Sequence, residues 1–373
     1  MDIAKLIRKN CQGFEPYVAG KPIETIKREL KLKKIVKLAS NENPIGPSKK
    51  AVKAIKDNAA KAFFYPDSNS YTLKHALSSK HKLPENNIFT AAGGDEIIEL
   101  VARLFFNPSD EIIISQHSFV RYEMAARLMN SKPVIIPMRE GFIQDLPAMA
   151  KACSANTKAI FITNPNNPTG TYNSKAALSS FLASIKPTIN GQKPLIIIDE
   201  AYFEYGKLQK DYPDSLEYLK KNENLIILRT FSKIYGLAGL RVGYGFAHKD
   251  IVDYIERIRP PFNVNSLAQA AAVASLSDSA QIKKGQSLIR KEKEFLEKEL
   301  KKLAMDYVKS AANFILIKSS PLKGKDLFVA LLKKGVIVRA MDEYELPDWI
   351  RLTIGLHDEN KMFIDKIKEV LNK

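Results

Sequence analysis

The run RTFSKIYGLAGLRVGYG, residues 229–245, holds the side chains whose types and spacing most clearly suggest chemistry. Lys233 stands between an apolar segment and four glycines, where a merely solvated lysine is not expected. Thr230 and Ser232 precede it, and Arg241 follows eight positions later. Hydroxyls and a planar guanidinium suit a phosphate ester, and a lysine beside them can act as a nucleophile toward a carbonyl group. The alternative is that Lys233 simply ends a strand at the surface.

Other polar or glycine-rich clusters also follow apolar runs. They are GGDE after residues 87–92, QHSF after 111–115, NPNNPTG after 158–163, and DEAY, which begins where the run 194–199 ends. The lysine run itself follows a fifth apolar segment, 224–229. If these runs are parallel strands, their carboxyl ends meet at one edge of the sheet, where α/β proteins bind ligands. The sequence therefore predicts one composite site.

Each cluster taken alone has an ordinary structural explanation. GGDE could be a loop and a helix N-cap, NPNNPTG an elaborate turn, and Asp199 a helix N-cap. A carboxylate after three isoleucines nevertheless needs a cationic or N–H partner if it is buried and charged. We favour the functional interpretation because all five clusters fall at the same predicted edge.

Pyridoxal 5′-phosphate satisfies all five clusters at once. Its aldehyde needs a lysine, supplied by Lys233, with which it forms a Schiff base. Its pyridine nitrogen needs a carboxylate, supplied by Asp199, and its phenolic oxygen needs donors, supplied by Asn167 and Tyr202. Its phosphate needs N–H groups, hydroxyls and an arginine. The residues predicted to bind the phosphate are Gly94, Asp95, Thr230, Ser232 and Arg241.

The elements that must position these residues alternate between strands and helices. Besides the five runs above, 241–247 is a sixth and less regular strand candidate, and helical patterns cover 95–106, 120–129 and 175–185. This pattern predicts an α/β fold with a mostly parallel sheet between helices. After about residue 265 the pattern changes to a long amphipathic helix, a strand at 313–318, another helix, and the strands VIVRA and IRLTIG.

We therefore expect two domains and an N-terminal segment. Residues 51–264 would form the large, cofactor-binding domain, and residues 265–373 a small α+β domain. The segment 1–50 is too short and too rich in proline to fold alone, so we expect it to pack on the small domain.

Composition narrows the class of protein. The formal net charge is +17, which could indicate nucleic-acid binding or attraction of an anionic substrate, but the lysines are spread along the whole chain and favour a solvated basic surface. A DNA-binding protein on the same fold would need an appended helix-turn-helix region, for which we find no room, and we expect no nucleic-acid partner.

The cysteine count and hydrophobicity point to a cytoplasmic protein. Two distant cysteines and five scattered histidines offer no metal-ligand spacing, so we expect free thiols and no metal. No apolar run approaches the roughly 18 residues that a bilayer requires, and the N-terminus does not resemble a signal peptide.

The motifs together resemble the fold-type I, aspartate-aminotransferase-like enzymes and, among them, the histidinol-phosphate aminotransferases. The matching segments run through nearly the whole chain: EPYVAGKPIE, KLASNENPIGPS, FYPD, GGDEII, TNPNNPTG, IIDEAY, RTFSKIYGLAGLRVGYG, PPFNVNSLAQAAA, GVIVRAM and IRLTIG. Two departures from the family pattern are Gly94, where relatives often have Ser or Ala, and Phe64, where many have arginine.

The resemblance implies further roles for individual residues. Lys233, Asp199 and Tyr202 would be catalytic, and Phe119 would stack on the cofactor ring. Tyr65 would reach the cofactor phosphate of a neighbouring subunit, which implies a homodimer with shared active sites. Arg351 would receive the substrate phosphate or the glutamate carboxylate, aided by Asn167. Arg339 and Tyr17 are further candidates for the phosphate.

The resemblance also implies a reaction. Histidinol phosphate and 2-oxoglutarate would be converted reversibly to imidazole-acetol phosphate and L-glutamate, a step of L-histidine biosynthesis. The alternative is an aromatic aminotransferase that acts on phenylalanine or tyrosine with the same mechanism; a decarboxylase of a phosphorylated amino acid is a more distant possibility.

Overall fold

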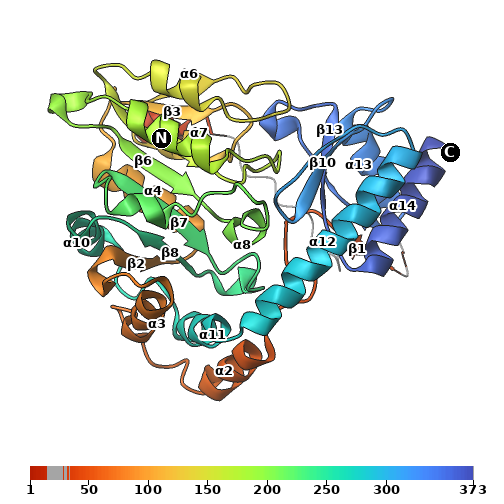
Figure 1. Ribbon diagram of the computed structural model, residues 1–373, viewed down its shortest axis with the longest axis horizontal. Coiled ribbons are helices and arrows are strands. Elements are labelled where there is room, and N and C mark those ends of the chain that lie inside the picture. Colours follow the sequence, from red (N-terminus) through yellow and green to blue (C-terminus); the bar gives the residue numbers. More distant parts are fainter. Residues whose placement is uncertain (15–27, 29–31, 33, 373) are drawn as a thin grey trace.

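The computed structural model describes residues 1–14, 28, 32 and 34–372. In Figure 1 the chain forms a larger part around one sheet and a smaller part around a second sheet, and the long helix α12 (Ser279–Lys302) runs from the first to the second. The predicted site Tyr17 lies outside the described residues.

The larger sheet has seven strands in the order β2-β8-β7-β6-β5-β3-β4. All are parallel to one another except β8, which is antiparallel to both neighbours. Their bounds are β2 Ile88–Ala91, β3 Glu111–Ser115, β4 Lys132–Ile136, β5 Thr157–Thr163, β6 Leu195–Asp199, β7 Leu225–Thr230 and β8 Gly243–Phe246. The mostly parallel sheet predicted from the sequence is confirmed.

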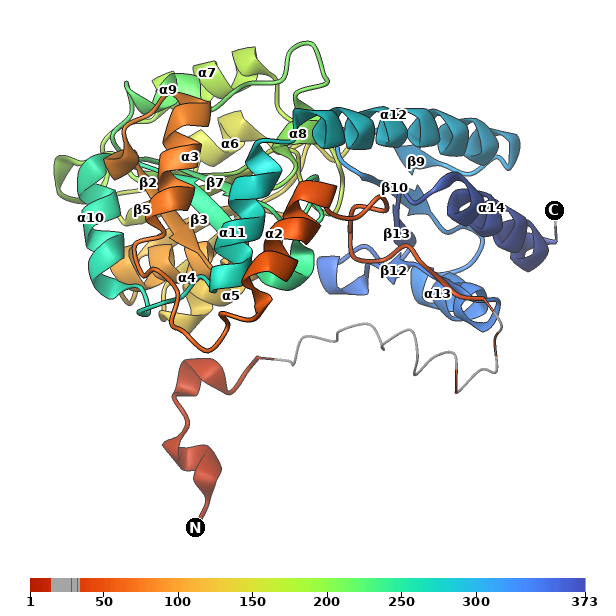
Figure 2. The ribbon, with the colours of Figure 1, turned by 90° about the horizontal axis from the view of Figure 1, so that it is seen from below.

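Consecutive apolar residues in the central strands serve two cores, because successive side chains of a strand point to opposite faces. Ile160 and Ile162 of β5 belong to one core, whereas Phe161 belongs to the other. Figure 2 shows α6 (Leu146–Lys151) and α7 (Lys175–Ser184) on one side of the sheet. On the other side lie α4 (Gly94–Phe105) and α5 (Arg121–Leu128), so the sheet is covered on both faces.

Further helices complete the large part. They are α2 Lys49–Ala59, α3 Tyr71–His81, α8 Phe203–Gly206, α9 Leu216–Leu219, α10 Lys249–Ile258 and α11 Ser266–Leu276. Helix α11 packs against α2 and α3. This packing favours counting α11 with the large domain, whereas the sequence division placed it in the small one. The division into domains remains a proposal.

The smaller part contains a four-stranded antiparallel sheet in the order β12-β13-β10-β9 and a parallel pair formed by β1 and β11. The strands are β1 Val36–Lys37, β9 Tyr307–Val308, β10 Phe314–Lys318, β11 Val336–Ile337, β12 Arg339–Ala340 and β13 Trp349–Thr353, with helices α13 Gly324–Lys333 and α14 His357–Leu371. The run VIVRA, predicted as one strand, is therefore split at Val338 between two sheets.

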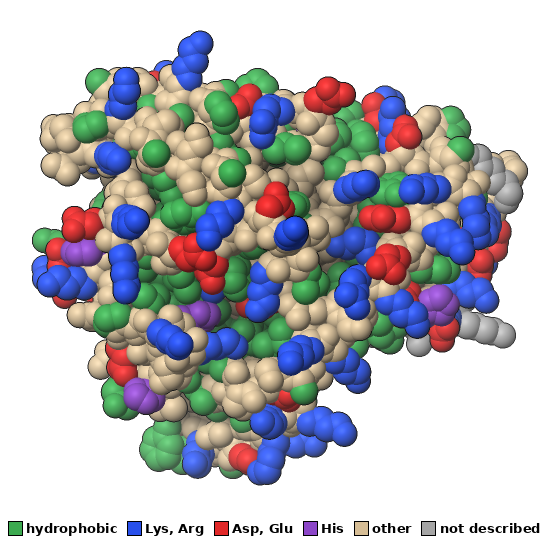
Figure 3. All heavy atoms as spheres, in the orientation of Figure 1, with side chains coloured by type: hydrophobic (Ala, Val, Ile, Leu, Met, Phe, Trp, Pro, Cys, Tyr) green, Lys and Arg blue, Asp and Glu red, His purple; other side chains and the backbone are tan. Residues whose placement is uncertain are grey.

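The basic side chains do not form one patch on the face seen in Figure 3. Lys and Arg are distributed over both parts and are interspersed with Asp and Glu. In the part of the chain that the structure describes, no helix combines the length and the apolar character needed to cross a membrane.

Candidate active site

Lys233 lies three residues beyond the end of the fully buried strand β7. Its side chain is half-buried, and Nζ lies 5.4 Å from the centroid of the Tyr202 ring. Tyr202 is itself 3% exposed and comes directly before α8, after the neighbouring strand β6. Two adjacent strands thus bring the predicted nucleophile and the predicted phenol to the same edge of the sheet.

Asp199 ends β6 and is buried. Its Oδ1 accepts a hydrogen bond of 2.9 Å from the Ala201 N–H, and its Oδ2 accepts one of 2.6 Å from the Tyr122 hydroxyl. Burial raises the pKa of the Asp199 carboxyl; the two hydrogen bonds and the charge of Lys233 act in the opposite direction. The two hydrogen bonds therefore fix the position of the Asp199 carboxylate but do not cancel its negative charge, because neither partner is a cation.

Tyr122 is a residue that the sequence analysis did not identify. It lies in α5, is fully buried, and accepts a hydrogen bond of 3.0 Å from the Thr163 hydroxyl. Burial and the neighbouring Asp199 raise the pKa of its hydroxyl well above the usual value, so it stays protonated and donates to the carboxylate. In the sequence Tyr122 looks like any residue on the apolar face of a helix. The only feature that could have indicated a role was its position three residues after Phe119.

An anion cradle forms where β2 leads into α4. Gly93 has a φ of +88°, and a Cβ there would lie 3.0 Å from Cζ of Arg241, so only glycine permits this approach. Arg241 Nη2 lies 3.6 Å from Asp95, and Nη1 donates to the Ser232 hydroxyl at 3.4 Å. The Thr230 hydroxyl donates to Ser232 at 3.0 Å. One guanidinium and two hydroxyls thus lie near the N-terminus of α4. This helix begins at Gly94, and its first N–H groups have no partner within the helix.

Arg351 joins the two parts of the protein. It lies on β13 of the small part, is 7% exposed, and donates hydrogen bonds to Asn167 Oδ1 of the large part and to the Ala39 carbonyl. Its Nε is buried and has no hydrogen-bond partner among the described residues. Because Asn167 uses its oxygen on Arg351, its amide N–H groups are left to donate elsewhere.

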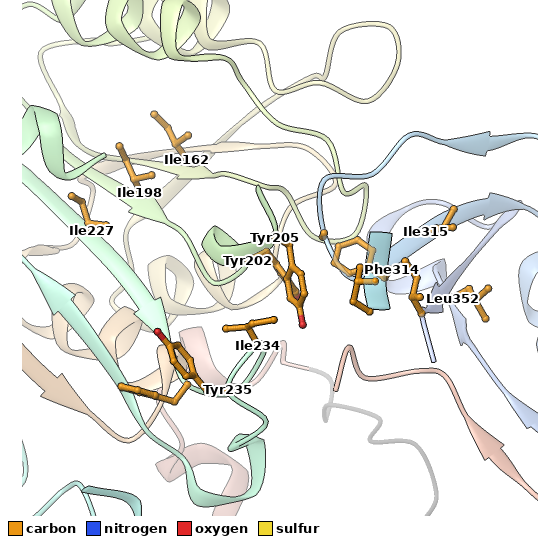
Figure 4. Packing of buried hydrophobic residues seen from close by; sticks show 14 of the residues in the cluster. Ile162, Ile198, Tyr202, Tyr205, Ile227, Ile234, Tyr235, Phe314, Ile315 and Leu352 are labelled. Carbon is orange, nitrogen blue, oxygen red and sulfur yellow. The ribbon is translucent and has the colours of Figure 1, made fainter. Parts of the chain in front are cut away.

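The phenol of Tyr202 also lies between the two parts, as Figure 4 shows. Its ring packs edge-on against Phe314 of β10, with 5.1 Å between ring centroids. Its hydroxyl accepts a hydrogen bond of 2.8 Å from Asn41, another residue that the sequence analysis missed. This contact leaves the hydroxyl proton of Tyr202 available to donate.

Three further predicted site residues, Phe119, Tyr65 and Arg339, lie in three different places. The ring of Phe119 packs edge-on against Tyr122, beside Asp199. Tyr65 is 82% exposed and stacks on Phe262, and none of its described contacts is with the residues above. Arg339 of β12 lies directly across from Arg351 and is paired with Glu343.

The arrangement combines an amine, a buried carboxylate, phenol and amide donors, and separate sites for two anionic groups. The cradle around Gly93 and Arg241 has the donors to hold one anion, and the surroundings of Arg351 have those to hold another. Such a site can bind a phosphorylated cofactor covalently and place an anionic substrate against it.

Comparison with known proteins agrees with this geometry. The family model for class I and II aminotransferases matches residues 33–367. The histidinol-phosphate aminotransferase of Moorella thermoacetica is 44% identical over 365 residues, covering 98% of this chain and 92% of that protein. Histidinol-phosphate aminotransferase 2 of Carboxydothermus hydrogenoformans is 43% identical over 366 residues, covering 98% of this chain and 99% of that protein.

Solved structures show the same fold. The histidinol-phosphate aminotransferase of Sinorhizobium meliloti in complex with pyridoxal-5′-phosphate superposes with a TM-score of 0.86 at 23% identity, covering 97% of this chain and 98% of that chain. The aspartate aminotransferase of Thermus thermophilus with maleate gives a TM-score of 0.82 at 18% identity, covering 98% and 99%. The expected fold type I is therefore confirmed, and the chain belongs to the class I and II aminotransferase family.

Proposed function

We propose that this protein is a cytoplasmic, pyridoxal-5′-phosphate-dependent histidinol-phosphate aminotransferase. It would interconvert histidinol phosphate and 2-oxoglutarate with imidazole-acetol phosphate and L-glutamate, with glutamate as the amino donor in L-histidine biosynthesis. The relatives that are 44% and 43% identical over nearly the whole chain carry this name. The two free cysteines agree with a reducing compartment.

The residues present fit the proposed cofactor. The cradle at Gly93 would bind its phosphate, and the buried carboxylate of Asp199 would stabilise a positive charge on its ring nitrogen. Asn167 and Tyr202 would donate hydrogen bonds to its phenolic oxygen, because each has a donor that its protein contacts leave free. Phe119 would pack on its ring, and Lys233 would hold it covalently.

Each side chain would then have a defined task in transamination. When bound, the cofactor supplies an aldehyde that takes up the amino group and a cationic ring that withdraws electrons from the substrate's Cα. Lys233 would carry the proton that leaves Cα, which requires its amine within reach of that carbon. Asp199, oriented by Tyr122 and Ala201, would keep the ring nitrogen protonated.

The observation that carries the substrate assignment is the pair of arginines on β12 and β13. Arg339 and Arg351 are directly opposite in an antiparallel pair, so their side chains emerge on the same face of the sheet. A phosphate ester has enough oxygen atoms to accept from both guanidinium groups, whereas the side chain of phenylalanine offers no anion. This feature favours histidinol phosphate over an aromatic amino acid.

Initial-rate assays test the substrate assignment directly. With 2-oxoglutarate as acceptor, we expect kcat/KM for histidinol phosphate to exceed that for phenylalanine by at least about 10²-fold, because phenylalanine has a single carboxylate and no phosphate that could accept from both arginines. A preference for phenylalanine would overturn the substrate assignment while leaving the reaction class intact.

We also propose a homodimer with shared active sites. A cluster of exposed aromatic side chains supports this assembly, since large exposed apolar patches on soluble proteins mark interaction surfaces. Its members are Phe63 (78% exposed), Phe64 (64%), Tyr65 (82%) and Phe262 (42%), whose rings are in contact in the pairs Phe63–Phe64 and Tyr65–Phe262. Residues 62–66 and 265–267 also line a surface hollow of about 400 Å³, beside which Tyr65 could extend into a second copy.

Complementation between two inactive variants tests this sharing. Lys233→Ala and Tyr65→Ala damage opposite halves of one shared site, so a mixed dimer would contain one intact site. After mixing in equal amounts and subunit exchange, we expect about a quarter of the wild-type activity, because half of the dimers are mixed and each has one of two sites restored. Activity no greater than the sum of the separate variants, despite demonstrated exchange, would contradict shared sites.

A further inference from the structure

Arg339 is held by a carboxylate that the sequence analysis did not single out. Glu343, in the short 3-10 turn Asp342–Tyr344, accepts from Arg339 Nε at 3.1 Å with Oε1 and from Nη2 at 2.7 Å with each of its oxygens. The side chains of Arg339 and Glu343 are 18% and 31% exposed. The ion pair is thus partly shielded, but the carboxylate keeps contact with water.

The ion pair lies beside Arg351. Arg351 lies directly across from Arg339, and its Nε has no hydrogen-bond partner. Tyr344 lies among these charges: burial raises the pKa of its hydroxyl to about 12, and Arg351, Glu343 and Arg339 all act on it. Together, Arg351, Arg339 and Glu343 carry a net charge of +1, and without Glu343 they would carry +2.

Under the proposed function, the surroundings of Arg351 form a substrate pocket that has to bind two different anions in alternation. One substrate presents a carboxylate of charge −1, and the other presents a phosphate ester whose charge at pH 7 is about −1.5 to −2. A pocket of fixed charge +2 would favour the phosphate, and one of fixed charge +1 would match the carboxylate. A partly shielded ion pair of this kind contributes on the order of 1 kcal/mol, which the second negative charge of a dianion can offset.

We propose that Glu343 is a displaceable counter-ion that lets one pocket accept both substrates. A carboxylate binds at Arg351 while the Arg339–Glu343 pair stays intact. A phosphate draws Arg339 away from Glu343, whose carboxylate then turns into water. Glu343 is therefore a specificity-determining residue that does not itself touch the substrate, and this inference rests on the proposed function.

The test compares Glu343→Gln with a matched control, Glu345→Gln. Both variants remove one negative charge from the same turn, but the described side-chain contact of Glu345 is with Gln116 rather than with Arg339. Inorganic phosphate and glutarate serve as competitive inhibitors of the half-reaction with glutamate, followed by the change in cofactor absorbance. Glu343→Ala, measured in parallel, provides a second variant in case the glutamine folds poorly.

We expect Glu343→Gln to lower the inhibition constant of phosphate about fivefold, because the anion no longer has to break an ion pair, while that of glutarate changes less than about twofold. Glu345→Gln should change neither. The KM for histidinol phosphate should fall relative to the KM for glutamate. An inhibition constant for phosphate that stays the same or rises would overturn the proposal, a rise showing that Glu343 only orients Arg339.

Failure of this inference can be distinguished from failure of the proposed function. If wild-type protein turns over histidinol phosphate but Glu343→Gln leaves phosphate inhibition unchanged, the counter-ion role is wrong and the function stands. If the wild type does not turn over histidinol phosphate but the variant still tightens phosphate binding, the counter-ion role stands and the substrate assignment falls.

Discussion

Replacement of Lys233 by alanine should lower transamination by about 10⁴-fold or more, because the variant loses both the covalent attachment of the cofactor and the group that moves the proton from Cα. Neither of its two described polar neighbours offers an amine: Tyr202, whose ring lies 5.4 Å from Nζ, is a phenol, and Asp199 is a carboxylate that already accepts two hydrogen bonds. Steady-state rates with glutamate measure the loss.

Spectroscopy separates this chemical effect from unfolding. Wild-type protein with pyridoxal 5′-phosphate should absorb as a covalent adduct, and reduction with borohydride followed by peptide mass spectrometry should place the adduct on Lys233. The variant should show neither signal, while Lys249→Ala, which changes an exposed lysine at the start of α10, should match the wild type. Full activity of Lys233→Ala, or an adduct on another lysine, would refute the mechanism.

Replacement of Asp199 by asparagine should lower kcat by about 10²- to 10⁴-fold, since removing one partner of a buried charge pair costs about 3–5 kcal/mol. The amide has nearly the same volume and can still accept the hydrogen bond from Tyr122 or from the Ala201 N–H. The change therefore removes the negative charge with little disturbance of the packing. Single-turnover rates with glutamate isolate the effect on the chemical step.

The matched control is Asp250→Asn, which removes a carboxylate from an exposed position in the first turn of α10. It should leave single-turnover rates within about twofold of the wild type, as surface substitutions usually do. If Asp199→Asn also stayed within that range, the carboxylate would have no part in stabilising the cofactor ring.

The central sheet was largely predictable because its strands are buried on both faces. Continuous runs such as EIIIS and LIIID carry no polar interruption, and the predicted 111–115 agrees with β3 residue for residue. Strand β4 was missed because its sequence, KPVII, includes a proline and lies at the sheet edge, where side chains are only partly buried. The division of VIVRA into two strands was not predictable. The run reads as one continuous strand, and only the partner with which it pairs changes at Val338.

The site was predictable wherever a residue directly follows a strand. Lys233 and Asp199 stand in local patterns that a surface loop does not explain, and the structure places them near each other. Tyr122, Asn41 and Glu343 gave no such signal, since their partners are distant in sequence or lie across a turn. Their contributions depend on tertiary packing, which periodicity does not encode.

The break between β11 and β12 has a consequence for how this protein can vary. Residues 336–337 pair with β1 and residues 339–340 pair with β13, so a single residue separates the two strand pairings. Inserting or deleting one residue there would rotate Arg339 to the opposite face of its strand, since side-chain direction alternates at every step. The length of this five-residue run is therefore constrained more strictly than its composition: a substitution that keeps the alternation leaves Arg339 on its face, whereas a gain or loss of one residue does not.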